Sequence, residues 1–254
     1  MNLQGLRVII LQVGVCIAIG STIILSANDR EIVTQAQERL SDEATPVQAG
    51  VMTERQRQHS KLYKYKSGNN ILDLLNLKDQ EVEVHQNEPL SFSVPNSVQA
   101  TDADEVRRIT CTADAVVVGE IRSKVSQITE NQKFIFTDYV FFVQEVLKNN
   151  TTGAVQQESE ITVTRPGGAV LIGGKHITAI DDSVLPLRKG KQYLLFLRYL
   201  PETESFTSIE TGESYELARD HVKVLRATST DLIAAKHNSN SLLTEVKSAA
   251  GSCR

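Results

Sequence analysis

The sequence predicts a mainly β protein whose strands form a small closed or nearly closed antiparallel barrel. Two observations predict this. Short β-branched or aromatic segments, separated by glycine and charged turns, follow one another between residues 115 and 225. The first of these segments, "AVVVGEIRSKVSQI", contains Gly119, which indicates a bend or a β-bulge. A helix before a bent first strand and a series of short strands favours a barrel over a flat sheet.

The N-terminus predicts an export signal or a membrane anchor over residues 1–27. Residues 8–27 carry no charged side chain, and Arg7 precedes them. The apolar run is long for a signal peptide, but Gln12 and Ser21 weaken it as a membrane span. Both alternatives stay open, and only the uncleaved form contacts the membrane through residues 8–27. In either case the rest of the chain is expected to be extracytoplasmic.

Two polar regions separate this segment from the barrel. Residues 28–70 are rich in charge and poor in branched apolar side chains, which favours a polar arm or linker. Residues 71–101 form a peripheral lead-in, where "NNILDLLNL" predicts a short helical turn and "QEVEVHQNEPLSFSVP" predicts a strand.

The barrel domain is expected over residues 102–225. A short helix runs to about Thr110 and is followed by the bent strand. The stretch "FIFTDYVFFVQEVL" contains five of the 13 Phe and Tyr residues, which predicts a central strand covered on both faces. The shorter strands "EITVT", "AVLI", "KQYLLFLRYL", "SFTSI", "SYEL" and "HVKVL" follow it. Residues 226–254 are a polar tail, and their partly helical stretch "SLLTEVKSAA" covers a sheet edge or stays frayed.

Cysteine usage is compatible with export. Cys16 lies in the apolar run, so Cys111 and Cys253 are left in the exported part. They can pair in an oxidising compartment, or they can remain two free thiols. The chain contains no CxxC sequence and no Cys/His cluster, so we expect no metal site and no cofactor.

The charge balance argues against nucleic acid as a partner. The chain has a net charge of −4. Residues 115–225 contain 12 basic and 14 acidic side chains, which gives a net charge of −2. A strand of phosphates attracts a basic surface, and this balance provides none.

The stretch "RPGGAVLIGGKH" resembles a phosphate-binding loop without satisfying its pattern. Such a loop needs a glycine five positions before the Gly-Lys pair and a Ser or Thr after it. Ala169 and His176 occupy those positions. The stretch instead predicts two Gly-Gly turns that flank a short apolar strand.

Four stretches, "ADAVVVGEI", "TDYVFFVQEVLK", "ITVTRPGG" and "LRKGKQYLLFLRYL", resemble a group of exported bacterial proteins of unassigned function. Their core is similar to the OB-type barrel of the tissue inhibitors of metalloproteinases and of netrin-like modules. The resemblance covers residues 102–225 and implies an OB-like β-barrel. In the inhibitors an N-terminal cysteine presents its free amine to the protease zinc. Cys111 stands near that place, but more than a hundred residues precede it, so inhibition is the less favoured alternative.

The function expected from these observations is a non-catalytic binding or scaffold module for an extracytoplasmic protein or an envelope polymer. No catalytic constellation is recognisable, whereas small barrels commonly recognise partners through rim loops. The polar stretches "KNNTTGAVQQES" and "GGKHITAIDDSVLP" are the candidate recognition loops, although both can equally be idle connections. The candidate residues in them are Asn150, Thr152, Lys175, His176, Thr178, Asp181 and Asp182. An extracytoplasmic hydrolase with an unrecognised site is the alternative.

Overall fold

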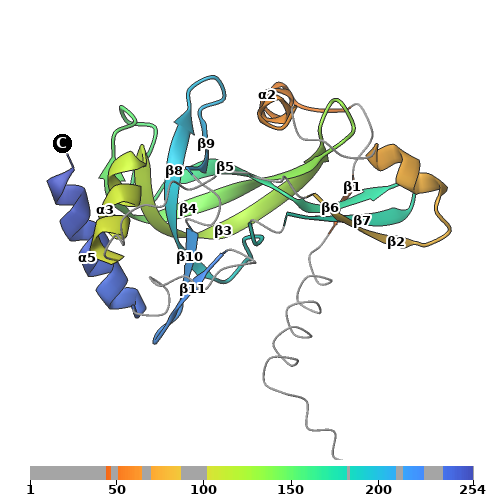
Figure 1. The fold of residues 1–254 in the computed structure, drawn as a ribbon. Coiled ribbons are helices and arrows are strands. Elements are labelled where there is room, and N and C mark those ends of the chain that lie inside the picture. The colour runs from red at the N-terminus through yellow and green to blue at the C-terminus, as the bar shows by residue number, and fades with distance from the viewer. Residues whose placement is uncertain are drawn as a thin grey trace, which may run out of the picture. The chain divides into compact units, whose positions relative to one another are not determined.

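The computed structural model of the chain describes residues 44–46, 51–64, 70–86, 102–181, 184–209, 214–225 and 237–253 (Figure 1). All of them belong to one compact unit. The expected signal peptide or anchor at residues 8–27 lies outside the described residues. Within the described ranges, no helix is long and apolar enough to cross a membrane.

Two long antiparallel strands, β3 (Ala115–Ile128) and β4 (Ile135–Asn149), form the longest ladder of the structure (Figure 1). The pairing shifts register at three places, one of which lies between Val118 and Gly119. A side chain at Gly119 would place its Cβ 2.0 Å from the carbonyl oxygen of Phe142. The predicted bulge is therefore confirmed, and glycine is required there because the two backbones approach each other so closely.

The chain is mainly β, as predicted. A seven-stranded sheet has the order β11-β10-β8-β3-β4-β5-β9, and β8 also pairs with β9. The remaining strands of this sheet are β5 (Glu160–Pro166), β8 (Gln192–Leu200), β9 (Ser205–Ser208), β10 (Ser214–Leu217) and β11 (Val222–Val224). The pairings β8–β3–β4–β5–β9–β8 thus form a closed path. Every strand of this path contributes to one apolar core, which includes Val117, Phe141, Val163, Leu195 and Phe206.

A second, four-stranded sheet has the order β1-β6-β7-β2 and was not anticipated as a separate sheet. It consists of β1 (Thr45–Pro46), β2 (Glu81–His85), β6 (Gly168–Ile172) and β7 (Lys175–Ile180). Its own apolar core joins Val170 and Ile177 to Ile71 of the 3-10 helix η1 (Ile71–Asn76). The predicted helical turn of the lead-in is confirmed as η1, and its predicted strand is confirmed over Glu81–His85, whereas residues 87–101 lie outside the described part of the chain.

The β6–β7 hairpin has the Gly-Gly turns expected of "RPGGAVLIGGKH". Gly167, Gly168, Gly173 and Gly174 all have positive φ angles, between 56° and 137°. Glycine adopts this backbone region without the steric cost that a Cβ would cause. The second turn leads directly into β7, so Lys175, His176 and Thr178 lie in a strand and not in the expected recognition loop.

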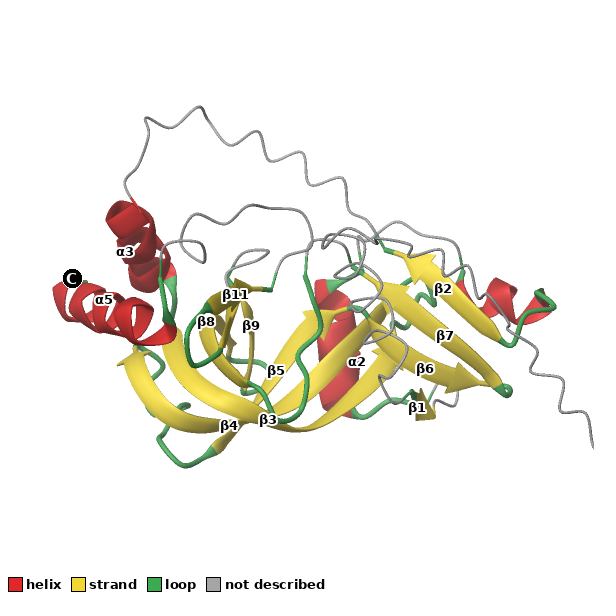
Figure 2. Cartoon of the chain, turned by 90° about the horizontal axis from the view of Figure 1, so that it is seen from below, coloured by secondary structure: helices red, strands yellow, loops and turns green. Residues whose placement is uncertain are grey.

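Two helices pack side by side at one end of β4: α3 (Asp102–Thr112) and α5 (Ser239–Ser252) (Figures 1 and 2). Leu242 and Val246 of α5 are fully buried against a cluster that includes Val106 and Ile109 of α3. A disulfide joins Cys111 at the end of α3 to Cys253, the residue after α5. The structure therefore resolves the open question of the two cysteines, and the predicted helical tail is a docked helix.

Lys148 ties β4 to the end of α3. Its Nζ donates hydrogen bonds to the carbonyl oxygens of Thr110, Cys111 and Ala113, at 3.0, 2.8 and 2.5 Å. The ammonium group has three donors, so all of them are used. Burial lowers the pKa of Lys148 from its ordinary value. The contact satisfies carbonyl groups that have no partner within the helix and places a positive charge at the negative end of its dipole.

We predict that Gly119→Ala lowers the free energy of unfolding by about 2–3 kcal/mol, because the new Cβ meets a backbone oxygen that cannot move aside. Gly251→Ala is the matched control, since a Cβ at Gly251 in α5 meets nothing within 4 Å. That substitution should raise stability by about 0.5–1 kcal/mol, as alanine favours the helix. Urea denaturation followed by circular dichroism measures both, and equal midpoints would refute the close approach at Gly119.

We also predict that Cys111→Ser with Cys253→Ser lowers the free energy of unfolding by about 2–5 kcal/mol. The disulfide spans 142 residues of sequence, so its loss frees a long loop in the unfolded chain. Guanidinium denaturation measures the effect. A reducing agent should destabilise the unmodified chain to the same extent and should not affect the double variant; an effect of reduction on that variant would contradict the assignment.

Candidate functional site

The first candidate loop follows β4 and has exposed polar residues. Asn150 and Thr152 are exposed, and Thr152 has a φ of +47°. The loop is held by Asn149, whose Oδ1 accepts hydrogen bonds from the amide and hydroxyl of Thr151 at 2.9 and 2.6 Å. The Nδ2 of Asn149 donates to the carbonyl oxygen of Val155 at 2.9 Å. The loop therefore presents its polar groups from a fixed backbone.

The second candidate group is not a loop and does not join the first. Lys175 donates a hydrogen bond from Nζ to the carbonyl oxygen of Leu77, and the Nδ1 of His176 lies 3.4 Å from the Oγ1 of Thr178. Asp181 follows β7 and is buried, whereas Asp182 lies outside the described residues. Among the residues that the structure describes, no group of three His, Cys, Asp or Glu side chains can hold a metal ion.

A more concentrated set of polar contacts surrounds α2 (Glu54–Leu62), a helix inside the region predicted to be a polar arm. Thr53 begins it with a capping box: its hydroxyl accepts from the amide of Gln56, and the Gln56 side chain accepts from the amide of Thr53. This pair satisfies two donors at the helix start. The helix lies beside β4 and β5 (Figure 2).

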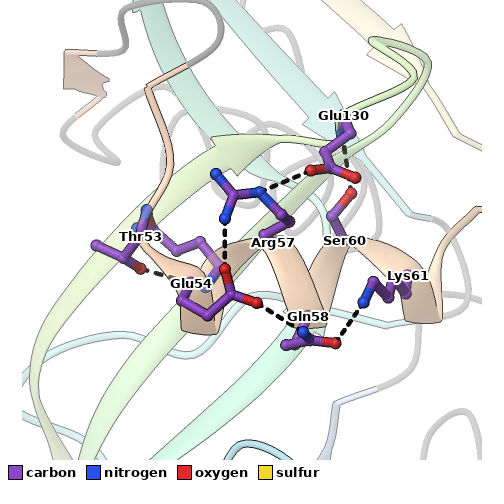
Figure 3. Close-up of polar contacts among 8 residues, drawn as sticks. Thr53, Glu54, Arg57, Gln58, Ser60, Lys61 and Glu130 are labelled. Atoms are coloured by element: carbon purple, nitrogen blue, oxygen red, sulfur yellow. Dashed lines mark hydrogen bonds and ion pairs between the residues drawn. The ribbon is translucent and has the colours of Figure 1, made fainter.

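Arg57 and Ser60 connect α2 to the turn between β3 and β4 (Figure 3). Nε of Arg57 lies 2.9 Å from Oε1 of Glu130, and the hydroxyl of Ser60 accepts a hydrogen bond from the Glu130 amide at 2.9 Å. Arg57 also pairs with Glu54 along the helix. The ion pairs are exposed to solvent, so we expect each to contribute less than about 1 kcal/mol.

The inner side of α2 carries His59, which is fully buried. Its Nδ1 lies 2.8 Å from Oδ1 of Asp138 on β4, and its Nε2 lies 2.7 Å from Oγ of Ser205 on β9. The hydroxyl of Thr203 lies 2.6 Å from that Oγ. Ser205 is also fully buried, and the side chain of Asp138 is 12% exposed. We call these residues, His59, Asp138 and Ser205, the His59 cluster.

The chemistry of the partners assigns the protons in the His59 cluster. An ionised carboxylate only accepts hydrogen bonds, so Nδ1–H of His59 donates to Asp138. In the neutral imidazole, Nε2 then accepts the hydroxyl proton of Ser205. The result is a continuous chain from carboxylate through imidazole to hydroxyl. This arrangement fixes α2 on the sheet and is also the one that activates a serine in acyl transfer.

Aromatic packing completes the contact of α2 with the sheet. Tyr63, the residue after α2, stacks on Phe134 and Phe136, with ring centroids 5.0 and 5.5 Å away. Burial raises the pKa of the Tyr63 hydroxyl well above its ordinary value, so the ring stays neutral. These three rings supply most of the apolar contact, because the helix itself has no apolar stripe.

Arg165 on β5 is a buried cation close to this region. Nε, Nη1 and Nη2 of its guanidinium have no hydrogen-bond partner among the described residues. Burial lowers the pKa of Arg165, while Tyr139, Tyr193 and Asp181 favour its charged form. The atoms of this guanidinium are closely covered, so its surroundings leave no space for a bound molecule.

No pattern in the sequence marks the His59 cluster. Asp138 and Ser205 lie 79 and 146 residues after His59, and no motif spacing connects them. The only local signal was the capping-box pattern of Thr53 and Gln56, which marks the start of a helix in the polar arm.

Comparison with known proteins does not assign this site. No family model matches the chain, and no curated protein matches it. Cys111 lies within α3, where its nitrogen is part of a peptide bond, so it presents no free amine of the kind that the inhibitors use. The chemistry of this site is therefore inferred from its own contacts.

We predict that His59→Ala lowers the free energy of unfolding by about 2–3 kcal/mol, because it leaves the carboxylate of Asp138 and the hydroxyl of Ser205 without the imidazole. Trypsin should also cleave at Arg55 and Arg57 of the variant faster. His85→Ala is the control, since that side chain is 52% exposed. Equal denaturation midpoints and equal cleavage rates in the two variants would contradict the role of His59 in docking α2.

Proposed function

We propose that the chain is an exported or membrane-anchored binding and scaffold module for an extracytoplasmic protein or envelope polymer. The observation that carries the proposal is the closed path of five strands with an ordered, exposed loop at its rim. The function requires no cofactor, and its binding surface is the loop between β4 and β5, residues 150–159.

The strand pairings support an OB-type barrel as the scaffold. β3, β4, β5, β8 and β9 close on one another, and the third and fifth of these strands pair in parallel. A closed path of five strands is what the proposed OB-type barrel requires, and such barrels bind their partners through loops and an exposed face. The disulfide between α3 and α5 favours an oxidising compartment outside the cytoplasm.

The chemistry of the loop favours a polar partner. Thr152, Gln156, Gln157 and Glu158 are exposed, so hydroxyl and amide groups outnumber charges. The side chain of Asn149 fixes the backbone of this loop, which reduces the entropy lost when a partner binds. Such a surface recognises its partner by hydrogen bonds, as a saccharide chain or an uncharged protein surface requires.

We predict that a photocrosslinking amino acid at Thr152 captures one specific partner in the native envelope. A probe at Thr178 tests the second candidate group, and Arg219, exposed after β10, is the control position. Mass spectrometry identifies the captured species. Capture at Thr152 but not at Arg219 supports the proposal, whereas the same set of products at all three positions, or none at Thr152, contradicts it.

A further inference from the structure

The His59 cluster combines the three chemical groups of a serine hydrolase in one hydrogen-bonded chain. Asp138 Oδ1 lies 2.8 Å from His59 Nδ1, and Ser205 Oγ lies 2.7 Å from His59 Nε2. Both distances are within the range in which an imidazole takes a proton from a hydroxyl while a carboxylate orients the ring. The three residues come from α2, β4 and β9, so their convergence arises from the fold and not from a local sequence motif.

We propose that Ser205 is an acyl-transfer nucleophile that hydrolyses small carboxylic esters, with His59 as its base. This activity is separate from the binding function proposed above and does not depend on it. It specifies a site for the hydrolase alternative, for which the sequence provided no residues. Asp138 is a positioning residue, because it contacts His59 and not the reacting atoms.

The reaction balances with an ester and water as reactants. His59 Nε2 takes the proton of Ser205 as Oγ bonds to the acyl carbon. The bond from that carbon to the alcohol oxygen then breaks, and the alcohol leaves with the proton from Nε2. Water adds to the acyl-serine with His59 again accepting a proton, and the carboxylic acid leaves as Ser205 recovers its proton. No redox partner or metal is needed.

The turn before β9 is the cover that must move to admit a substrate. Ser205 is the first residue of β9, and the turn of residues 201–204 precedes it. The turn is closed by long hydrogen bonds, 3.2 Å from Thr203 N to Leu200 O and 3.4 Å from Glu204 N to Pro201 O. Glu204 has a φ of +50°, an uncommon conformation for a residue with a side chain.

The contacts that hold α2 lie outside this turn, so movement of the turn does not release His59. α2 is held by Glu130 and by the aromatic contacts of Tyr63, and none of these residues belongs to the turn. The hydroxyl of Thr203 lies against Ser205 Oγ at 2.6 Å, so its displacement uncovers the nucleophile. Because His59 and Ser205 are fully buried, the proposal is limited to small, acetyl-sized acyl groups.

A purely structural His59 cluster and a nucleophilic one differ in their response to two substitutions. Asp138→Asn keeps an oxygen that can accept from Nδ1–H, and it keeps the size of the side chain, but it removes the charge and permits the wrong tautomer. Ser205→Ala removes the nucleophile. Ser208→Ala is the matched control, because Ser208 is on the same strand and its buried Oγ has no hydrogen-bond partner among the described residues.

The experiment treats the full chain with a small fluorophosphonate probe and locates the adduct by peptide mass spectrometry. We expect one adduct, on Ser205, that is absent from Ser205→Ala and unchanged in Ser208→Ala. Asp138→Asn should slow labelling by about 10³–10⁴-fold. Circular dichroism and thermal unfolding show whether each variant is folded, and p-nitrophenyl acetate hydrolysis should follow the same order of variants.

Opening of the turn is tested with Thr203→Gly, which removes the side chain over Ser205. We expect faster labelling of Ser205 in this variant than in the unmodified chain. Absence of a Ser205 adduct in both proteins, while a known serine hydrolase is labelled in the same solution, overturns the proposal. Equal labelling of the unmodified chain and a folded Asp138→Asn variant also overturns it, because His59 would then not act as the base.

Discussion

The antiparallel pairing of β3 with β4 is the interaction on which the rest of the structure depends. Near one end, Lys148 of β4 hydrogen-bonds to the chain at the end of α3, and Ala115, the first residue of β3, follows that helix closely in sequence. The middle contributes Val117 and Phe141 to the core of the closed strand path. At the other end, Ile128 and Ile135 enter the core of the second sheet. One ladder therefore supplies side chains to several apolar cores, and its bulges direct them to the required faces.

The sequence predicts this ladder well because the residue types within each strand already indicate a buried strand. β-branched residues fill β3, aromatic residues fill β4, and Gly119 marks the bend. β7 was missed because Lys175 and His176 open it, and only the alternation of Ile177 with Ala179 indicates a strand. The pairing of the two cysteines could not be predicted either, because it requires α5 to pack against α3, 142 residues apart in sequence at the disulfide.

The His59 cluster was beyond sequence reasoning for a different reason. A polar helix normally indicates solvent exposure, and α2 has no apolar stripe that predicts packing. Its burial depends on Asp138 and Ser205, which distant strands provide. Buried polar groups must be paired, so the imidazole of His59 needs both Asp138 and Ser205. The same mutual dependence that docks the helix also aligns a base with a hydroxyl.

The polar character of α2 also sets how the molecule fluctuates. When α2 leaves the sheet, the apolar surface that it exposes is that of Tyr63, Phe134 and Phe136, and water can replace its polar contacts. The strand path, in contrast, opens only by exposing its apolar core. The molecule therefore has two levels of opening, and amide protons of α2 exchange with solvent through the less costly one. Such a hierarchy allows one face of the sheet to be uncovered while the protein remains folded.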